Sequence, residues 1–229
     1  MMNDAIVIIA ALPGELKPLV RSWAALETKN GVDGWQHPNG PIMAFAGGMG
    51  ANAASRSFER ARQVCEPMQL LSVGWAGALR EELAPGAIIR ASMVRDLNTG
   101  EMLPANGPGG LLLTSTRVAV REDKHRLAKT YDGSVAIDME AATLARLALA
   151  NGLGFRAIKA ISDTLDEDLP DMNPFVTSAG QFATARFIAH VATKPKYWSS
   201  LAQFGKQSKL AANNLCAAIA DDIGIERPK

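Results

Sequence analysis

Apolar residues along the chain fall into short continuous runs, separated by stretches in which they recur at helical spacing. The first run, residues 5–11, is wholly apolar and rich in β-branched side chains, which is typical of a strand covered on both faces. Pro13 and Gly14 interrupt this run. The stretch that follows predicts a helix with apolar positions at Leu16, Leu19, Val20 and Trp23.

The same alternation continues along the rest of the chain. Further strands are expected at residues 41–46, 70–73, 87–94, 111–113, 118–120, 135–137 and 155–161. Helices are expected at residues 52–64, from 121 onward, and at 138–150, 175–192 and 198–221. Residues 29–40, 74–77 and 98–110 are typical of turns and loops. Strands that alternate with helices of about 10–15 residues indicate crossover connections and a largely parallel sheet. The pattern predicts an α/β domain with a C-terminal tail.

The tail gives the only sign of a boundary in the sequence. Lys194 and Pro195 precede a last helical stretch, and no internal repeat or low-complexity tract occurs. We therefore expect an α/β domain over residues 1–195, and a C-terminal helical extension of the same domain over residues 196–229.

Composition excludes several classes of protein. With 48% hydrophobic and 21% charged residues among 229, the chain can bury a sizeable core, unlike a disordered or collagen-like sequence. A net charge of +1 provides no overall field that would attract nucleic acid. Cys65 and Cys216 cannot make a disulfide framework, so a reduced, cytoplasmic setting is expected. The longest apolar run, residues 5–12, is far shorter than the roughly 20 residues of a membrane span. It has neither a basic lead-in nor a small-residue cleavage site, so no signal peptide is expected.

Three carboxylates follow predicted strands. Glu15, Glu140 and Asp163 come just after the strands that end near residues 11, 137 and 161. The carboxyl ends of parallel strands share one edge of a sheet, where ligands collect. A shared pocket is one interpretation. The other is that each carboxylate only stabilises a helix N-terminus, by about 0.3–1 kcal/mol.

A glycine-rich turn, Gly47 to Asn52, also ends a strand and opens a helix. Glycines there allow backbone N–H groups to approach an anion or a sugar hydroxyl, or they allow tight packing. The turn lacks the spacing of a dinucleotide fingerprint and the lysine of a P-loop. Nucleoside triphosphates and NAD are therefore not expected.

Five motifs occur in an order that resembles the nucleoside phosphorylase superfamily, the group that includes 5′-methylthioadenosine/S-adenosylhomocysteine nucleosidase. They are residues 11–16 (ALPGEL), 47–54 (GGMGANAA), 74–79 (GWAGAL) with Pro85-Gly86, 138–142 (DMEAA) and 159–163 (KAISD). The resemblance covers about residues 5–190. It implies a three-layer α/β/α fold with a mixed, mostly parallel twisted sheet, and it makes a homodimer the default assembly.

One branch of the superfamily is more similar than the others. Residues 163–170, together with Lys194-Pro195 and residues 201–215, resemble the hopanoid-associated phosphorylases more than the methylthioadenosine enzymes.

The resemblance also implies roles in cleaving a purine N-glycosidic bond. Asp163 matches the general acid that protonates purine N7, which requires a raised pKa, and Ser162 would orient it. Glu140 matches the carboxylate that binds the ribose hydroxyls, and Met139 would pack against the sugar. Glu15 matches the carboxylate that activates the attacking water. A bare carboxylate repels a phosphate dianion, so hydrolysis is favoured over phosphorolysis.

Three further positions complete the predicted site. Gly48 belongs to the glycine-rich turn and is expected to contact substrate. Lys159 stands where family nucleosidases usually carry arginine, and it lacks the bidentate fork of that residue. Trp75 replaces a small residue and would either floor the pocket by stacking on the base or fill the core. The segment between Asp96 and Thr114 is shorter than in methylthioadenosine nucleosidases. The aromatic residue that stacks on adenine in those enzymes is replaced near residues 118–119 of this chain. The purine and the 5′ substituent therefore stay open.

The remaining polar residues predict little chemistry. His37, His125 and His190 lack ligand spacing, so no metal is expected, and no organic cofactor is implied. Arg117 and Arg121 either approach an anion or lie in solvent. The basic and aromatic tail would pack on the domain or on a dimer partner, or make a weak peripheral membrane contact.

We thus expect an enzyme that hydrolyses an adenine-type nucleoside. In the first alternative, inorganic phosphate is co-substrate, seated by residues 47–50 and by Thr114, Ser115 or Thr116. In the second, the substrate is an adenosyl-hopane-like lipid, which an apolar route from the sugar's 5′ side toward the tail would favour. In the third, the chain only binds nucleosides.

Overall fold

A single mixed sheet forms the centre of the computed structural model, which describes residues 5–228. Its eleven strands are β1 (Ala5–Ala10), β2 (Ala24–Lys29), β3 (Val32–Gln36), β4 (Ile42–Ala46), β5 (Pro67–Ala78), β6 (Ile88–Arg90), β7 (Met93–Asp96), β8 (Met102–Pro104), β9 (Leu111–Thr114), β10 (Ser134–Asp138) and β11 (Gly154–Asp163). The main path is β2-β3-β4-β1-β5-β10-β9-β7-β8, and β11 pairs with β5 and β6. The central pairs β4–β1, β1–β5 and β5–β11 are parallel, whereas β2–β3, β3–β4 and β7–β8 at the edges are antiparallel.

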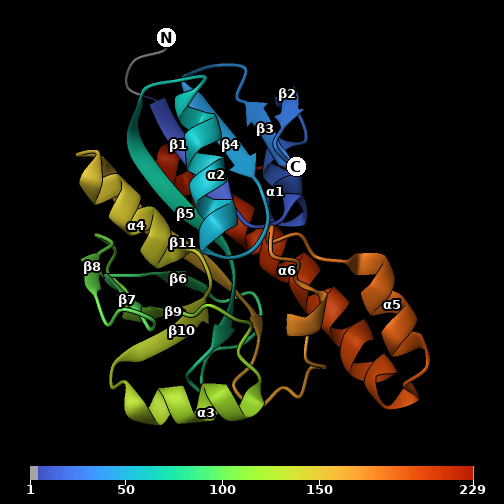
Figure 1. The fold of residues 1–229 in the computed structure, drawn as a ribbon. Helices are drawn as coiled ribbons and strands as arrows, with labels where there is room; N and C mark the ends of the chain where they lie inside the picture. The colour runs from blue at the N-terminus through green and yellow to red at the C-terminus, as the bar shows by residue number, and fades with distance from the viewer. Residues whose placement is uncertain (1–4, 229) are drawn as a thin grey trace.

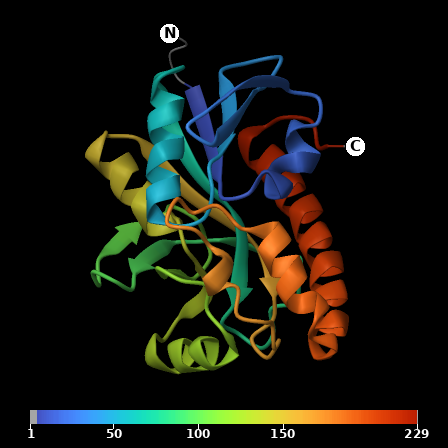
Figure 2. The same cartoon turned by 45° about the vertical axis from the view of Figure 1, so that its right-hand side comes forward.

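Helices cover both faces of this sheet (Figures 1 and 2). They are α1 (Pro13–Val20), α2 (Ala51–Arg62), α3 (Arg121–Thr130), α4 (Ala141–Ala150), α5 (Thr184–Ala192) and α6 (Trp198–Ile223), with short 3₁₀ turns η1 (Asn173–Phe175) and η2 (Pro195–Tyr197). Along β1, Val7 and Ile9 pack toward α2 and α4, whereas Ile8 and Ala10 pack toward α1 and α6. This period of two with both faces buried explains the continuously apolar run and confirms the three-layer α/β/α fold.

The N-terminal half contains a hairpin that the sequence pattern did not predict. Strands β2 and β3 occupy part of residues 24–36, where we expected turns from residue 29. Asn30 and Gly31 have φ values of 54° and 71°, as a two-residue hairpin turn requires. Strand β2 is almost wholly exposed, so no hydrophobic alternation marks it.

Several predicted boundaries are wrong. Residues 74–77 continue strand β5 instead of forming a turn, and residues 118–120 form no strand. The expected strand at 87–94 is divided into β6 and β7. Of the helix expected at 175–192, only α5 is formed, and the rest is irregular chain with the turn η1.

The C-terminal helix belongs partly to the core. Leu215, Cys216 and Ile219 of α6 are fully buried with α1 and the sheet, whereas the N-terminal turns of α6 lie beside α5 (Figure 1). Within residues 5–228, no helix is both long enough and apolar enough to cross a membrane.

Candidate active site

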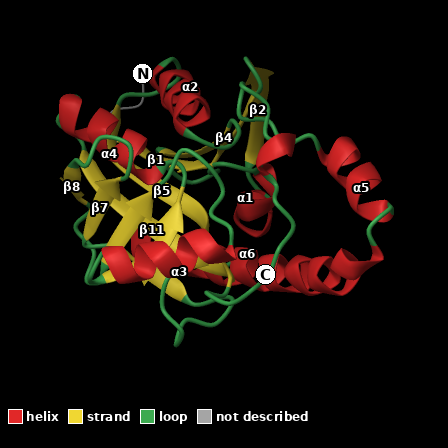
Figure 3. Cartoon of the chain, turned by 60° about the horizontal axis from the view of Figure 1, so that its bottom comes forward, coloured by secondary structure: helices red, strands yellow, loops and turns green. Residues whose placement is uncertain are grey.

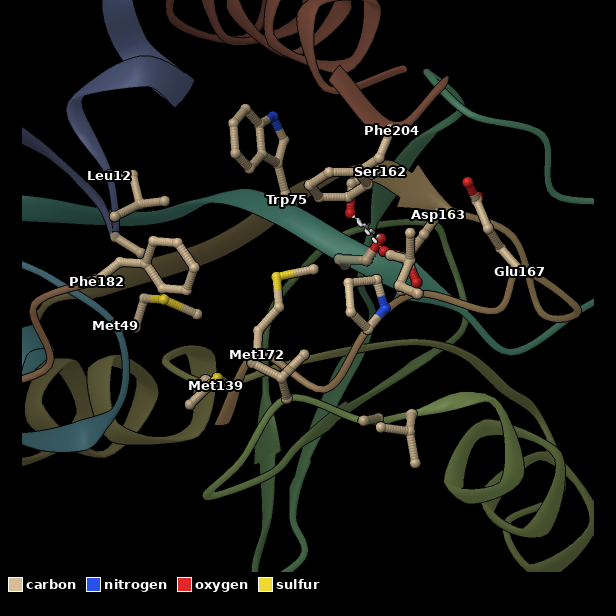
Figure 4. Close-up of a pocket in the computed structure, with 18 of the residues that line it drawn as sticks. Leu12, Met49, Trp75, Met139, Ser162, Asp163, Glu167, Met172, Phe182 and Phe204 are labelled. Atoms are coloured by element: carbon tan, nitrogen blue, oxygen red, sulfur yellow. Dashed lines mark hydrogen bonds between the residues drawn. The ribbon is translucent and has the colours of Figure 1, made fainter. Parts of the chain in front are cut away.

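A cavity of about 540 Å³ lies where several strands of the sheet end (Figure 4). Its polar wall comes from the residues that follow β1 and β10 and from the last residues of β5 and β11. This wall includes Glu15, Trp75, Asp138, Met139, Glu140, Ser162 and Asp163. Segments distant in sequence therefore meet in one site.

Glu15, in the first turn of α1, is 3% exposed and is held by two backbone donors. Leu12 N donates to Oε2 at 2.7 Å, and Trp75 N donates to Oε1 at 2.8 Å. Burial raises the pKa of Glu15, although these hydrogen bonds and the ammonium of Lys159 act in the opposite direction. The site thus holds a fixed carboxyl group with raised basicity.

Glu140, directly before α4, forms the second carboxyl group. Gly50 N donates to its Oε1 at 2.6 Å, and Met139 N donates to its Oε2 at 3.3 Å. Burial and the neighbouring carboxylate of Asp138 raise the pKa of Glu140 to about 7, with Lys159 opposing. Glu140 therefore changes its charge near neutral pH.

Asp163, the last residue of β11, forms the third. Ser162 Oγ donates to Asp163 Oδ1 at 2.7 Å, as the dashed line in Figure 4 marks. Lys124 Nζ lies 2.8 Å from Asp163 Oδ2 and also donates to the carbonyl oxygen of Thr164. Both carboxylate oxygens therefore have a donor, and the orientation of the side chain is fixed.

Lys124 is a residue that the sequence interpretation missed. It is 1% exposed and comes from α3, a helix in which charged residues predominate. The abundance of charged residues alone does not distinguish an inward lysine from its solvent-facing neighbours. The only available signal was the one-turn spacing that separates Lys124 from Ala128 and Val120 on an otherwise polar helix.

Trp75 both lines the cavity and packs against the core beside α1 and α6. Its indole Nε1 is buried without a hydrogen-bond partner among residues 5–228. The side chain therefore both lines the cavity and fills the core, and its stacking on a base stays a prediction.

The opposite wall of the cavity is strongly apolar. It is built by the chain before α5, by α5 itself and by the start of α6. Its members are Leu169, Pro170, Met172, Phe182, Phe187, Ile188, Val191, Leu201 and Phe204. Figure 4 shows Phe204 near Ser162, Phe182 beside Met49 and Leu12, and Met172 between them. The first turns of α6 therefore reach the cavity, and a route from the sugar's 5′ side toward the tail stays a prediction.

A family profile described as "Phosphorylase superfamily" matches residues 5–108 and 107–193. The chain belongs to this superfamily. A comparison with curated protein sequences gives no match.

Among the solved structures that are similar in fold to this chain are three enzymes from two bacteria. The 5′-methylthioadenosine/S-adenosylhomocysteine nucleosidase of Neisseria meningitidis, in complex with methylthio-immucillin-A, is 17% identical with a TM-score of 0.72, over 96% of this chain and 98% of that one. The corresponding nucleosidase of Helicobacter pylori is 15% identical with a TM-score of 0.69, over 96% and 100%. The futalosine hydrolase of H. pylori is 16% identical with a TM-score of 0.68, over 95% and 98%. At these identities the comparison establishes the shared fold.

Six of the eight predicted site residues of this phosphorylase-superfamily protein line the cavity, and two lie behind its wall. Gly48 donates its N–H to Ala11 O at 2.8 Å, and its φ of 114° together with Gly180 leaves no room for a side chain. Packing accounts for this glycine. Lys159 is fully buried, 2.8 Å from Asp138 Oδ2 and 3.2 Å from Val73 O. A direct substrate contact by Gly48 or Lys159 stays a prediction.

Lys159 instead neutralises the carboxylates around it. Burial acts to lower the pKa of Lys159, but Asp138, Glu140 and Glu15 outweigh burial and raise it. The lysine is therefore a buried cation shared by three acidic groups.

No group of three or more His, Cys, Asp or Glu side chains in residues 5–228 is arranged to hold a metal ion. The expectation that the reaction uses neither metal nor organic cofactor stays a prediction.

Proposed function

We propose that this chain hydrolyses the N-glycosidic bond of an adenine-type nucleoside. The observation that carries the proposal is that Glu15, Glu140 and Asp163 line one cavity. A nucleosidase needs a base for water, an anchor for the sugar and an acid for the leaving base, whereas a binding module needs no acid–base pair. The fold shared with 5′-methylthioadenosine/S-adenosylhomocysteine nucleosidases supports the same assignment.

In the proposed reaction, Glu15 takes a proton from water as the water oxygen attacks C1′ of the ribose. The C1′–N9 bond breaks and its electron pair passes to the purine, which receives a proton at N7 from Asp163. The base leaves as neutral adenine, and Lys124 stabilises the carboxylate that Asp163 becomes. Buried, fixed groups of this kind need no reorganisation during the reaction.

Glu140 and Met139 are assigned to the sugar. The carboxylate of Glu140 would accept hydrogen bonds from the ribose hydroxyls and stabilise the positive charge that develops on the ribose ring. Met139 lines the same wall and would pack against the ring. Trp75 presents an aromatic surface suited to stacking on a base.

The charges near Glu15 favour water over phosphate as the nucleophile. Glu15, Asp138 and Glu140 share the buried ammonium of Lys159, whereas the buried ammonium of Lys124 is paired with Asp163. A phosphate dianion beside Glu15 would meet more carboxyl groups than ammonium groups. Arg117 and Arg121 also line the cavity, as does Lys124, but they are already paired with Asp123, Asp166 and Asp163, respectively. Binding of phosphate would therefore be opposed, while neutral water is not.

The residues assigned to phosphate in the phosphorolytic alternative do not gather around the cavity. Thr114 Oγ1 already donates to Asp138 Oδ1 at 2.7 Å and accepts from Ala142 N at 3.1 Å. Ser115 and Thr116 are not among the lining residues, and of the glycine-rich turn only Met49 lines the cavity. These contacts support hydrolysis.

A large apolar 5′ substituent is a second candidate that a specific observation favours. The apolar wall made by the chain before α5, by α5 and by α6 would accept an alkyl or lipid group better than a hydroxyl or a homocysteinyl group. An adenosyl-hopane-like lipid is the corresponding substrate.

An adenine-release assay distinguishes hydrolysis from phosphorolysis and a small 5′ substituent from a large apolar one. Methylthioadenosine, adenosylhomocysteine, adenosine and 5′-alkylthioadenosines of increasing chain length would each be assayed with and without millimolar phosphate. We expect release that does not depend on phosphate and a kcat/KM that rises with alkyl chain length. The chain-length trend follows from burial of about 0.8 kcal/mol per methylene.

Asp163→Asn is the control for the chemical step. The amide keeps the shape of the side chain but cannot give a proton to N7, so kcat should fall by about 10²–10⁴ while nucleoside binding is largely kept. Equal loss of binding and turnover would contradict the acid role. Adenine release that requires phosphate would replace the hydrolase by a phosphorylase and remove Glu15 from the base role.

Several finer statements belong to the same proposal. We infer a cytoplasmic homodimer that needs no cofactor, in which residues 196–229 are a C-terminal helical extension of the same domain and make a weak peripheral membrane contact. Superfamily membership supports the dimer, and the composition of residues 172–220 supports the membrane contact.

A further inference from the structure

In the segment that contains α5 and most of α6, every charged residue (Asp, Glu, Lys or Arg) is basic. Residues 172–220 contain no Asp or Glu, but they contain Arg186, Lys194, Lys196, Lys206 and Lys209. The whole chain carries only +1, so the remaining residues are net negative. This segment is therefore the positive region of an otherwise slightly acidic protein.

Two large apolar side chains are exposed in the same region. Ile188 of α5 is 58% exposed and Trp198, at the start of α6, is 56% exposed. The indole N–H of Trp198 donates to Val191 O at 3.0 Å, which places the ring at the C-terminal end of α5. Ile188 lies one turn before Val191 on that helix, so both exposed side chains belong to the C-terminal half of α5 and the start of α6.

The cavity reaches the surface at this point. Ile188 lines the cavity although more than half of it is exposed, and Phe187 and Val191 line it from the same helix. Figures 1 and 3 show α5 and the start of α6 projecting together from the sheet. An apolar edge with several basic side chains therefore lies at one opening of the site, with Glu167 lining the same cavity.

We propose that this edge, defined by Arg186, Ile188, Lys194, Trp198 and Lys206, docks on an anionic lipid bilayer with the cavity opening against the bilayer. Tryptophan and isoleucine insert at the boundary between headgroups and acyl chains, and lysine and arginine pair with anionic headgroups. A lipid-linked substrate could then pass from the bilayer into the cavity without crossing water.

The charge also decides against a second copy of the chain as the occupant. A two-fold interface places the same surface of both subunits face to face. Two such edges would bring their basic side chains together with no acidic partner from residues 172–220. An anionic surface has the complementary charge.

Co-sedimentation of the full chain with vesicles tests the proposal. With vesicles containing about 30 mol% phosphatidylglycerol, most of the protein should pellet at low salt, and little should pellet with pure phosphatidylcholine. The double variant Ile188→Ser/Trp198→Ser should lower the bound fraction about five-fold or more. Leu149→Ser removes a leucine of α4 that is 64% exposed, and it is the matched control that should leave binding unchanged.

A charge variant keeps the test decisive if the double variant fails to fold, as judged by its thermal melt. Arg186→Gln/Lys194→Gln/Lys206→Gln should also reduce binding several-fold, because it removes attraction to the headgroups. The proposal is overturned if phosphatidylglycerol vesicles do not bind the protein, or if neither variant lowers binding. A dimer in solution that Ile188→Ser/Trp198→Ser converts to a monomer would also overturn it, since a second copy then covers the edge. The assay contains no nucleoside, so its result is independent of the proposed hydrolysis.

Discussion

Lys159 shows how a single buried charge organises the polar wall of the cavity. Its ammonium pairs with Asp138 at 2.8 Å and also interacts with Glu140 and Glu15, all of them at least nine-tenths buried. Three carboxyl groups thus share one cation. Burial raises the pKa of both Glu15 and Glu140, that of Glu140 to about 7, so these two carboxyl groups hold a proton more readily than an exposed glutamate does.

This charge balance predicts opposite effects of Glu140→Gln on stability and on function. The pKa of Glu140 is raised in the folded state, so that state binds a proton more tightly than the unfolded chain, and stability falls as pH rises from about 4.5 to 7. Removing the charge should therefore raise the free energy of unfolding at pH 8 by about 1–3 kcal/mol and change it little at pH 4. The same variant should raise KM for the nucleoside, because the ribose loses its anionic acceptor.

Urea denaturation at both pH values, with Glu81→Gln as an exposed control, measures the stability effect. Steady-state kinetics measures the second. A variant that is less stable at pH 8 than the parent would contradict the assigned cause of the shift.

The three carboxylates could be predicted from the sequence because they follow strands whose carboxyl ends meet. Lys124 could not, because α3 offers several charged residues and only packing determines that this one points inward. Gly48 and Lys159 illustrate the converse. Both residues belong to motifs and were therefore predicted to contact substrate. Whether a residue faces the cavity or lies behind its wall depends on packing neighbours that the sequence does not specify.

At the scale of elements, glycines within β5 make room for the carboxylates. A Cβ on Gly74 would lie 2.8 Å from Glu15 Oε1, and the φ of Gly74 is 137°. A Cβ on Gly77 would lie 3.1 Å from Asp163 Oδ2. The sequence interpretation took residues 74–77 for a turn because glycines commonly mark one. Here they mark the close approach of two catalytic candidates to a continuous strand.

Gly74→Ala should therefore damage activity more than folding. The methyl group would push Glu15 away from the position fixed by Leu12 and Trp75, and kcat should fall about 100-fold, as for other displaced catalytic groups. The strained φ should also lower stability by about 1–2 kcal/mol.

Gly40→Ala is the matched control, since Gly40 has no atom within 4 Å of an added Cβ. Adenine release and thermal melts would be compared for the two variants. If both variants lost equally little activity and stability, the position of Glu15 would not depend on the absence of a side chain at Gly74.

Elements without a hydrophobic period were the least predictable. Strand β2 is exposed along its length, so only the Asn30-Gly31 turn could have revealed the hairpin. The helix expected at residues 175–192 was too long, because Phe175 and Phe182 lie outside α5 and pack against its Phe187. A helical period cannot distinguish such packing from a longer helix.

At the scale of the whole molecule, α6 both packs on the domain and lines the cavity, two roles that the sequence analysis considered separately. Its first turns build the apolar wall of the cavity, whereas its second half fills the layer between the sheet and α1. The tail is thus an integral layer of the fold as well as part of the site. Changes in the first turns of α6 can therefore alter the site without weakening the core.

Leu215 and Leu210 provide a matched test of this division, because they lie on the same helix with 0% and 47% exposure. Leu215→Ala leaves a cavity against the sheet and should lower the free energy of unfolding by about 2–5 kcal/mol. Leu210→Ala should lower it by about 1 kcal/mol or less, because much of its surface is already in water. A single unfolding transition in both variants would show that the helix and the sheet unfold together. Loss of α6 signal before the rest of the protein would instead make residues 196–229 a separate unit.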